Sequence, residues 1–281
     1  MEKITTERIR WAVVTGATRG IGRSLSLNLA RNGYSIFAVA RSRELLEQLS
    51  TNVRDNGVMF SSLSLDLAED TAAETLYRSI HPLLNVGEVE VLCLNAAINS
   101  SGPFTEIPLA VHERMLAVNS LFNLRFLHFV LPLLKMQKRC SVVLLSSQSA
   151  MIPVPWMACY AASKSFVHSL GLALSHELKG SVVRLITAVP AHTDTSAVDS
   201  LELSPEERRQ IPRGRTPGEI ADRVVKAILS GSNGIVTNVP FFGAFRLMLG
   251  ATPISYLLKQ SGKMFSFLSR EARFPRGADI P

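Results

Sequence analysis

The chain has 281 residues, of which 47% are hydrophobic and 19% charged, and its formal net charge is +7. This composition excludes a chain that is disordered throughout, and it suffices for the core of one large α/β domain or two small ones. The positive charge suits nucleic acid, a phosphate-bearing cofactor or anionic lipid. The sequence has no zinc-finger spacing and no aromatic-basic motif, so we predict no nucleic-acid partner.

Three cysteines, Cys93, Cys140 and Cys159, follow no metal-ligand spacing, and we therefore predict no metal site. Their number fits a reducing compartment. Residues 1–10 are polar and charged, without the apolar core of a signal peptide. Since no uninterrupted apolar stretch reaches the roughly 18 residues typical of a membrane span, we expect a cytoplasmic protein.

Short β-rich runs alternate with longer segments whose apolar residues recur at helical spacing. The predicted strands are 11–15, 34–40, 58–65, 89–94, 141–145, 181–189 and 234–238. Helices are predicted from the end of the first strand to residue 31, from residue 42, and over 71–84, 109–136, 158–178 and 217–230. This alternation predicts an α/β fold, a Rossmann-like doubly wound parallel sheet of about seven strands with helices on both faces.

A glycine cluster, residues 15–22 (TGATRGIG), joins the first predicted strand to the first predicted helix. Glycines suit a backbone that turns sharply and approaches a pyrophosphate closely, and a helix N-terminus offers unpaired N–H groups to phosphates. An ordinary glycine turn is the alternative. The position of the cluster, between strand and helix, favours nucleotide binding.

Tyr160 and Lys164 lie four residues apart in a predicted helix, which places them on one face. A free phenol has a pKa of about 10, too high for efficient proton exchange near neutrality, and a nearby ammonium would lower it. The pair therefore predicts a proton-transfer site. The alternative is two surface residues of an amphipathic helix.

Both motifs, T-G-x-x-x-G-I-G and Y-x-x-x-K, closely resemble those of the short-chain dehydrogenase/reductase family, and the resemblance extends over about residues 11–238. It implies that residues 1–238 form a dinucleotide-binding catalytic domain. It also implies that the glycine cluster shapes the cofactor-binding loop. The residues expected to form this loop are Gly16, Thr18, Arg19, Gly20, Ile21 and Gly22.

The resemblance further implies a catalytic set of four residues. Tyr160 would donate a proton, and Lys164 would tune Tyr160 and bind the ribose. Ser147, the best match among the serines that end the fifth predicted strand, would polarise the substrate oxygen; Ser146 and Ser149 lie close enough in sequence to be confused with it. Asn119 would bend its helix and hold a water that connects Lys164 to solvent.

The end of the second predicted strand bears on the choice of cofactor. A site that prefers NAD places an acid there, whereas an arginine accommodates the 2′-phosphate of NADP. Arg41 follows this strand, no acid precedes Glu44, and Arg19 lies in the glycine cluster. A guanidinium matches phosphate oxygens in a two-pronged geometry, so we predict NADP(H). Ser42 and Arg43 are weaker candidates, and we interpret Arg43 as a surface residue.

Two short motifs after the third and fourth strands also match the family. Asp66, followed by Leu67, is implied to accept a hydrogen bond from the adenine amino group, although a helix N-cap is equally plausible. Asn95 and Ala96 are implied to pack beside the adenosine ribose. Ala97 stands where the family has glycine.

After the sixth predicted strand, Pro190 and Thr195 match the loop that closes over the nicotinamide. Ala191 replaces the family glycine, and His192 has no implied role. Substrate specificity is expected from residues 99–108, the apolar run 151–157, and a lid over 193–213.

We therefore predict hydride transfer from NADPH to the carbonyl of a small apolar substrate, in a homodimer or homotetramer. The alternatives are alcohol oxidation with NADP, or a regulator that binds cofactor without catalysis. Residues 239–281 form an apolar and basic C-terminal extension. It can lie on a membrane surface, pack over the substrate cleft, or contact a second subunit.

Overall fold

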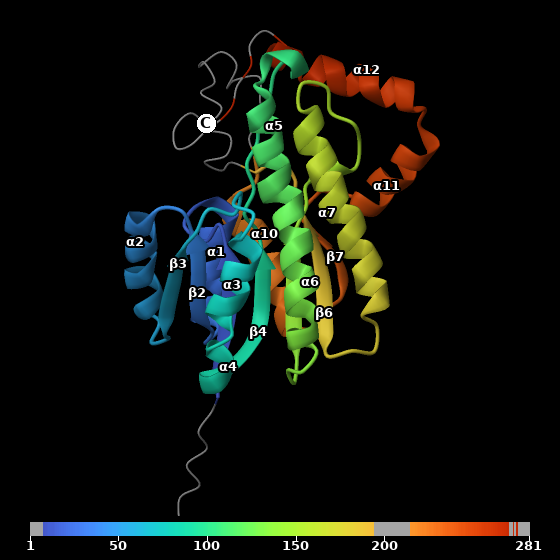
Figure 1. Cartoon of the computed structure of the whole chain (residues 1–281). Helices are drawn as coiled ribbons and strands as arrows, with labels where there is room; N and C mark the ends of the chain where they lie inside the picture. Colours follow the sequence, from blue (N-terminus) through green and yellow to red (C-terminus); the bar gives the residue numbers. More distant parts are fainter. Residues whose placement is uncertain (1–7, 194–213, 270–271, 273, 275–281) are drawn as a thin grey trace, which may run out of the picture.

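The computed structural model describes residues 8–193, 214–269, 272 and 274. A single parallel sheet has the strand order β3-β2-β1-β4-β5-β6-β7 (Figure 1). The strands are β1 (Ile9–Thr15), β2 (Ser35–Ala40), β3 (Phe60–Ser64), β4 (Gly87–Leu94), β5 (Cys140–Leu145), β6 (Val183–Val189) and β7 (Gly234–Thr237). All seven predicted strands are thereby confirmed, and so is the Rossmann-like fold.

The helices follow the predicted pattern with two differences. They are α1 (Gly20–Arg31), α2 (Arg43–Arg54), α3 (Ala72–Ile80), α4 (Leu83–Val86), α5 (Leu109–Leu116), α6 (Phe122–Leu134), α7 (Ala158–Glu177), α10 (Pro217–Leu229), α11 (Phe242–Ala251) and α12 (Ile254–Met264). The first difference is that the helix predicted over 71–84 is divided into α3 and α4. Pro82 lies at the division. The helix is interrupted there because proline has no N–H to continue the helical hydrogen bonds.

The second difference lies in the helix predicted over 109–136. A π-helical segment, η2 (Ala117–Leu121), separates α5 from α6. By length and composition the whole stretch Leu109–Leu134 could cross a membrane, although charged residues interrupt it. It has the character of a core helix, because the large side chains of Phe126 and Leu134 are fully buried in the same cluster as the strands.

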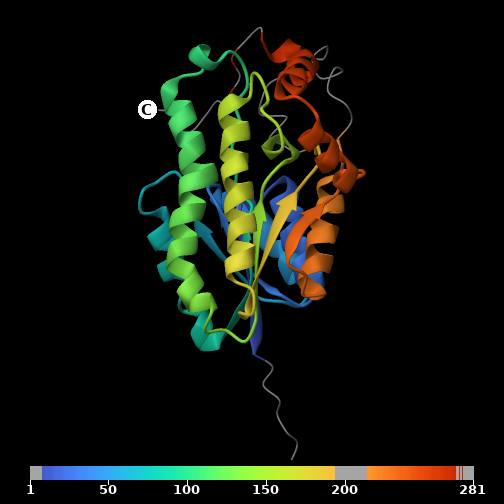
Figure 2. The ribbon, with the colours of Figure 1, turned by 90° about the vertical axis from the view of Figure 1, so that its right-hand side faces the viewer.

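The sheet lies between two layers of helices. Alternate strand residues, such as Val13 and Val14 of β1, enter separate apolar clusters on opposite faces. Helices α3, α6 and α7 cover one face, and α1, α2 and α10 cover the other (Figure 2). Burial on both faces explains why the strands read as almost continuous apolar runs. Since all strands are parallel, their carboxyl ends lie along one edge, where polar side chains gather.

We expect Phe126→Ala to destabilise the fold strongly, because Phe126 is fully buried between α6 and the sheet. Loss of such a side chain costs about 3–5 kcal/mol of unfolding free energy. The matched control is Phe129→Ala on the same helix, where the side chain is 43% exposed. Urea denaturation of both variants should show a large midpoint shift for Phe126→Ala alone. Equal shifts would contradict the packing described here.

Candidate active site

The glycine cluster forms a tight loop between β1 and α1. Gly16 and Gly20 have φ angles of 64° and 49°, in the left-handed region that favours glycine. A Cβ atom on Gly22 would clash with the carbonyl of Gly16. The N-cap residue of α1, Arg19, provides no side-chain hydrogen bond to the first turn, so the backbone N–H groups there are available to an anion. The loop therefore fits a phosphate-bearing cofactor.

The side chain of Asn95 is hydrogen-bonded to the backbone of this loop. Its Nδ2 donates to the carbonyl oxygens of Thr15, at 2.9 Å, and Gly16, at 3.2 Å. In return, Thr15 Oγ1 accepts from the backbone N–H groups of Asn95, at 3.0 Å, and Ala96, at 3.2 Å. Sequence reasoning placed Asn95 beside a ribose and missed this positioning role. The signal was available in principle, since Thr15 and Asn95 end the strands that lie side by side at the centre of the sheet.

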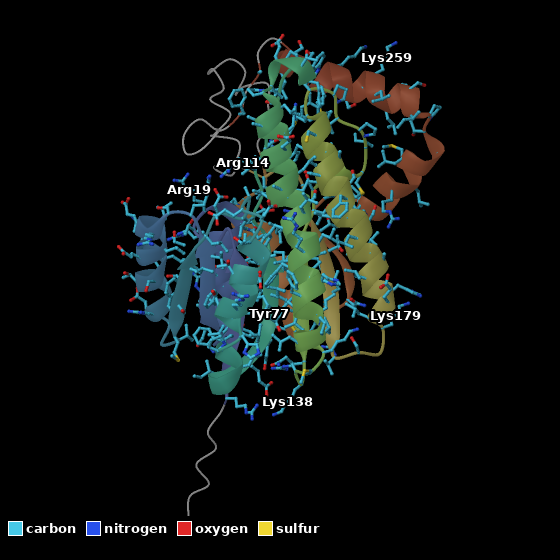
Figure 3. The ribbon with its side chains drawn as sticks, in the orientation of Figure 1. Arg19, Tyr77, Arg114, Lys138, Lys179 and Lys259 are labelled. Carbon is cyan, nitrogen blue, oxygen red and sulfur yellow. The ribbon has the colours of Figure 1, made fainter. Side chains whose placement is uncertain are left out.

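The predicted phosphate-binding arginines, Arg19 and Arg41, are both exposed at the carboxyl edge of the sheet. Figure 3 shows Arg19 at this edge together with Arg114, a residue to which sequence reasoning gave no role. The weaker candidate Ser42 has a structural function, because its hydroxyl accepts from the backbone N–H of Leu45 at 3.2 Å and caps α2. Arg43 is the exposed first residue of that helix, as we interpreted it.

Asp66 lies in the turn after β3 and has partners on both carboxylate oxygens. Oδ1 accepts from the backbone N–H of Ala68 at 3.0 Å, and Oδ2 accepts from the Arg114 guanidinium of α5. Burial raises the pKa of Asp66, but the Ala68 amide, Arg114 and the charge of Arg41 together outweigh it, so the pKa is lowered. Asp66 does not cap α3, whose N-cap is Thr71. Leu67 beside it is buried in the core.

Tyr160 and Ser147 come together at this edge, from α7 and the turn after β5. Burial raises the pKa of Tyr160 and the nearby Ser147 hydroxyl lowers it, and the net shift is upward. The expected lowering by Lys164 is therefore wrong for this structure. The physical reason is that burial of the phenol dominates, while the Lys164 ammonium donates to the carbonyl oxygen of Leu145 at 2.8 Å.

Lys164 follows Tyr160 by four residues on α7, and only 3% of its surface is exposed. Burial lowers the pKa of Lys164 to about 8. The three candidate serines can now be distinguished. Ser147 contacts Tyr160, Ser146 is buried and donates to the carbonyl oxygen of Lys164 at 3.1 Å, and the backbone N–H of Ser149 donates to Ser147 Oγ at 3.1 Å.

Asn119 occupies the middle of the π-helical segment, so the predicted irregularity of its helix is present. Its side chain bonds both backbone groups of Ile98, each at 2.9 Å, and donates to Ser163 Oγ of α7 at 3.0 Å. Its backbone carbonyl accepts from Asn123 Nδ2 at 2.7 Å. Asn119 thus connects the loop after β4 to the helix that carries Tyr160 and Lys164.

The loops expected to border the substrate lie close together. The backbone N–H of Gly102 donates to the carbonyl of Trp156 at 2.8 Å, and Trp156 has a left-handed φ of 67°. The carbonyl of Pro190 accepts from the backbone N–H of Gln148 at 3.0 Å, so the loop after β6 borders the serine turn. Thr195 and nearly all of the predicted lid lie outside the described residues.

The part of the chain that the structure describes contains no group of three His, Cys, Asp or Glu side chains placed to hold a metal ion. Cys93 is a fully buried small apolar residue whose pKa is raised to about 12 by burial, as its position in an apolar run suggested. The half-buried Cys159 donates to the carbonyl of His112 at 3.8 Å, beside the substrate loops.

Comparison with known proteins agrees with this fold. A family model described as short chain dehydrogenase matches residues 10–205. The very-long-chain 3-oxoacyl-CoA reductase of Ajellomyces capsulatus is 30% identical over 239 residues, which cover 83% of this chain and 68% of the relative. The human enzyme of the same name is 30% identical over 184 residues, covering 64% and 58% of the two chains.

A solved structure of an actinorhodin polyketide ketoreductase variant with NADPH is also similar. It has a TM-score of 0.73 and 25% sequence identity, and the match covers 82% of this chain and 95% of the ketoreductase. The chain spans between 53% and 68% of the length of the curated relatives.

Proposed function

Because the chain belongs to the short-chain dehydrogenase/reductase family, we propose that it uses NADPH to reduce the carbonyl group of an apolar, lipid-like substrate to an alcohol. The observation that carries this proposal is the proximity of Tyr160 and Ser147 at the carboxyl edge of the sheet, with the buried Lys164 four residues further along α7. Alcohol oxidation by the same residues is the alternative direction.

NADPH, when bound, supplies the hydride that the carbonyl carbon receives. The residues of this chain supply the proton and the polar environment. Burial raises the pKa of Tyr160, so its phenol stays protonated near neutral pH and donates a proton to the substrate oxygen. Ser147 donates a hydrogen bond to the same oxygen. The charge of Lys164 would favour the phenolate that forms on Tyr160 after proton donation, but burial outweighs this effect and the pKa of Tyr160 stays raised.

The cofactor assignment is supported by two features of the carboxyl edge and by one similar structure. The glycine cluster and the N-terminus of α1 fit a pyrophosphate. Arg19 and Arg41 are both exposed at this edge, and an arginine there would accommodate the 2′-phosphate of NADP(H). The similar ketoreductase was solved with NADPH. Within this assignment, Thr18 and Ile21 border the pyrophosphate, Asp66 and Ala96 the adenosine, and Pro190 the nicotinamide.

A 3-oxoacyl thioester with a long acyl chain is the substrate class that we favour. Very-long-chain 3-oxoacyl-CoA reductases are among the relatives, and the loop over residues 151–157 offers an apolar wall. The net charge of +7 would attract the phosphates of an acyl-CoA. Specificity for this class over other apolar ketones belongs to the proposal.

The first prediction concerns Tyr160→Phe, which removes the proposed proton donor and keeps the ring. We expect NADPH binding to persist and turnover of 3-oxoacyl and other apolar ketones to fall by about 10²–10⁴-fold or more. NADPH fluorescence and absorbance assays measure the two quantities. Near-normal turnover in the variant would remove Tyr160 from the mechanism. A wild type that binds NADPH but reduces no ketone would favour a regulatory role.

The second prediction concerns pH. Burial disfavours the Lys164 ammonium, so its pKa lies below the usual value, at about 8. The charge is therefore present below about pH 8 and lost as the pH rises through this value. We expect kcat/KM for carbonyl reduction to fall above about pH 8, and the residual activity of Lys164→Arg to lack this decline, because arginine stays charged. A rate that increases through pH 8 would contradict the assignment.

The C-terminal extension presents an apolar surface in the structure. Helices α11 and α12 project beyond the carboxyl edge of the sheet near α7 (Figures 1 and 2). The exposed apolar side chains here are Phe241, Leu247, Met248, Ile254, Tyr256, Leu258 and Met264. The buried Ser261 of α12 instead donates to the carbonyl of Pro153, in a loop expected to border the substrate, so packing over the cleft stays an alternative for this part of the extension. We propose that this surface of α11 and α12 rests on an anionic membrane, because residues 239–270 contain four basic residues and no acidic one.

The third prediction tests this surface with vesicles that contain phosphatidylserine. We expect wild type to float with them, and added salt to weaken the binding, since each basic residue contributes about 1 kcal/mol. Leu247→Gln/Met248→Gln should lose binding, because these side chains are 78% and 54% exposed. The matched control, Met136→Gln/Met59→Gln, changes side chains that are 81% and 53% exposed elsewhere, and it should bind normally.

Absence of vesicle binding by wild type would overturn the membrane proposal. In that case the surface of α11 and α12 would be assigned to a second copy of the chain if Leu247→Gln/Met248→Gln shifted the sedimentation coefficient. A homodimer or homotetramer remains part of the proposed function. The subunit contact would use another surface, on α6 and α7, where Leu124, Phe129 and Phe166 are about two-fifths exposed.

A further inference from the structure

The ion pair between Arg114 and Asp66 lies at the adenosine end of the proposed cofactor site. The two side chains are 19% and 20% exposed, and they join α5 to the turn after β3. A partly desolvated pair of this kind interacts more strongly than a pair in water. The ion pair of Arg125 and Asp70 provides the contrast, because its side chains are 43% and 91% exposed and such pairs contribute little.

Arg41 is the neighbour of this pair. Strands β2 and β3 are aligned with Ala40 opposite Ser64, and the backbone N–H of Leu65 donates to the carbonyl of Ala40 at 3.1 Å. Ser64 Oγ donates to the carbonyl of Arg41 at 2.8 Å. Arg41 and Asp66 therefore leave adjacent strands at the same edge. Among the described residues, no ion pair connects Arg41 to a carboxylate.

A free carboxylate at this place would oppose NADP(H) in two ways. It would attract the guanidinium of Arg41, and it would repel a 2′-phosphate, whose charge near neutral pH is about −1.5 to −2. In sites that prefer NAD(H), an acid binds the ribose 2′-hydroxyl in place of a 2′-phosphate. The bond from Arg114 to Asp66 Oδ2 neutralises the carboxylate and leaves Arg41 available.

We propose that Arg114 is a positioning residue that determines cofactor specificity: by pairing with Asp66 it keeps Arg41 free for the 2′-phosphate, and so favours NADP(H) over NAD(H). This inference rests on the proposed function, because it takes NADP(H) as the cofactor. It assigns Arg114 no contact with the cofactor or substrate. Its effect acts through the charges of Asp66 and Arg41.

Calorimetric titration with NADP⁺ and with NAD⁺ tests the proposal without any turnover. In Arg114→Met, we expect the ratio of the two affinities to shift on the order of tenfold toward NAD⁺. A tenfold shift corresponds to about 1.4 kcal/mol. Arg114→Lys keeps the positive charge and should retain most of the preference. Arg125→Gln, the control from the exposed pair on α6, should leave the ratio unchanged.

A second substitution separates electrostatics from folding. Adding Asp66→Asn to Arg114→Met removes the unpaired carboxylate, so the preference for NADP⁺ should return. If Arg114 only held α5 to the turn after β3, Asp66→Asn would not restore the preference, because asparagine does not replace the lost ion pair. Any effect of Asp66→Asn at the adenine applies to both cofactors and cancels in the ratio.

The outcomes also separate this inference from the proposed function. If wild type binds NADP⁺ no more tightly than NAD⁺, the cofactor assignment is wrong and the inference is overturned with it. If wild type prefers NADP⁺ but Arg114→Met preserves the ratio, or Asp66→Asn fails to restore it, the role of Arg114 alone is overturned.

Discussion

Hydrogen bonds between the ends of β1 and β4 organise the whole functional edge of the sheet. These strands are neighbours at its centre, where the order turns from β3-β2-β1 to β4-β5-β6-β7. At this position the connections diverge to opposite sides, and ligands of open α/β sheets bind there. Thr15 and Asn95 exchange bonds across the junction, and Gly16 packs against Ala96 so closely that a Cβ atom would meet the Ala96 Cα at 2.9 Å. The glycine cluster takes its shape from this contact.

Asn119 extends this constraint to the catalytic helix. Its side chain holds Ile98, a few residues after Asn95, and also Ser163, which lies between Tyr160 and Lys164 in sequence. The cofactor loop and the catalytic helix are thereby held by two sets of hydrogen bonds, which the short segment from Asn95 to Ile98 connects. Amide side chains suit this function, because each offers donors and an acceptor to backbone groups that would otherwise be buried without partners.

Burial determines the charge states at the active site, and it acts in opposite directions on the two groups. Burial disfavours the charged form of each group. The charged form of Tyr160 is the phenolate, so its pKa is raised, whereas the charged form of Lys164 is the ammonium, so its pKa is lowered. The sequence spacing predicted only the attraction between the two. Its consequence, a lowered pKa of Tyr160, was wrong because spacing carries no information about desolvation.

Local patterns were sufficient to predict the strands and the glycine cluster, whereas the set of Ser147, Tyr160 and Lys164 was implied by the family resemblance. Each depends on residues that are close in sequence or on apolar runs. The features that were missed depend on distant pairs. Asp66 and Arg114 are 48 residues apart, and Asn95 and Thr15 are 80 apart. The irregular helix at Asn119 was implied by the family resemblance, whereas the contacts of Asn119 with Ile98 and Ser163 were not predicted.

The proposed membrane surface and the substrate loops form a continuous structure. Ser261 of α12 is buried and donates to the carbonyl of Pro153, and a Cβ atom on Gly262 would lie 3.7 Å from Pro155. The next residue, Trp156, accepts a hydrogen bond from Gly102 through its carbonyl. Since α12 contacts the loop that borders the active site, a bilayer against its outer face would lie beside the entrance for an apolar substrate. A lipid-like substrate could then bring its carbonyl to Tyr160 without exposing its acyl chain to water. Transfer of the chain into water costs about 0.8 kcal/mol for each CH₂ group.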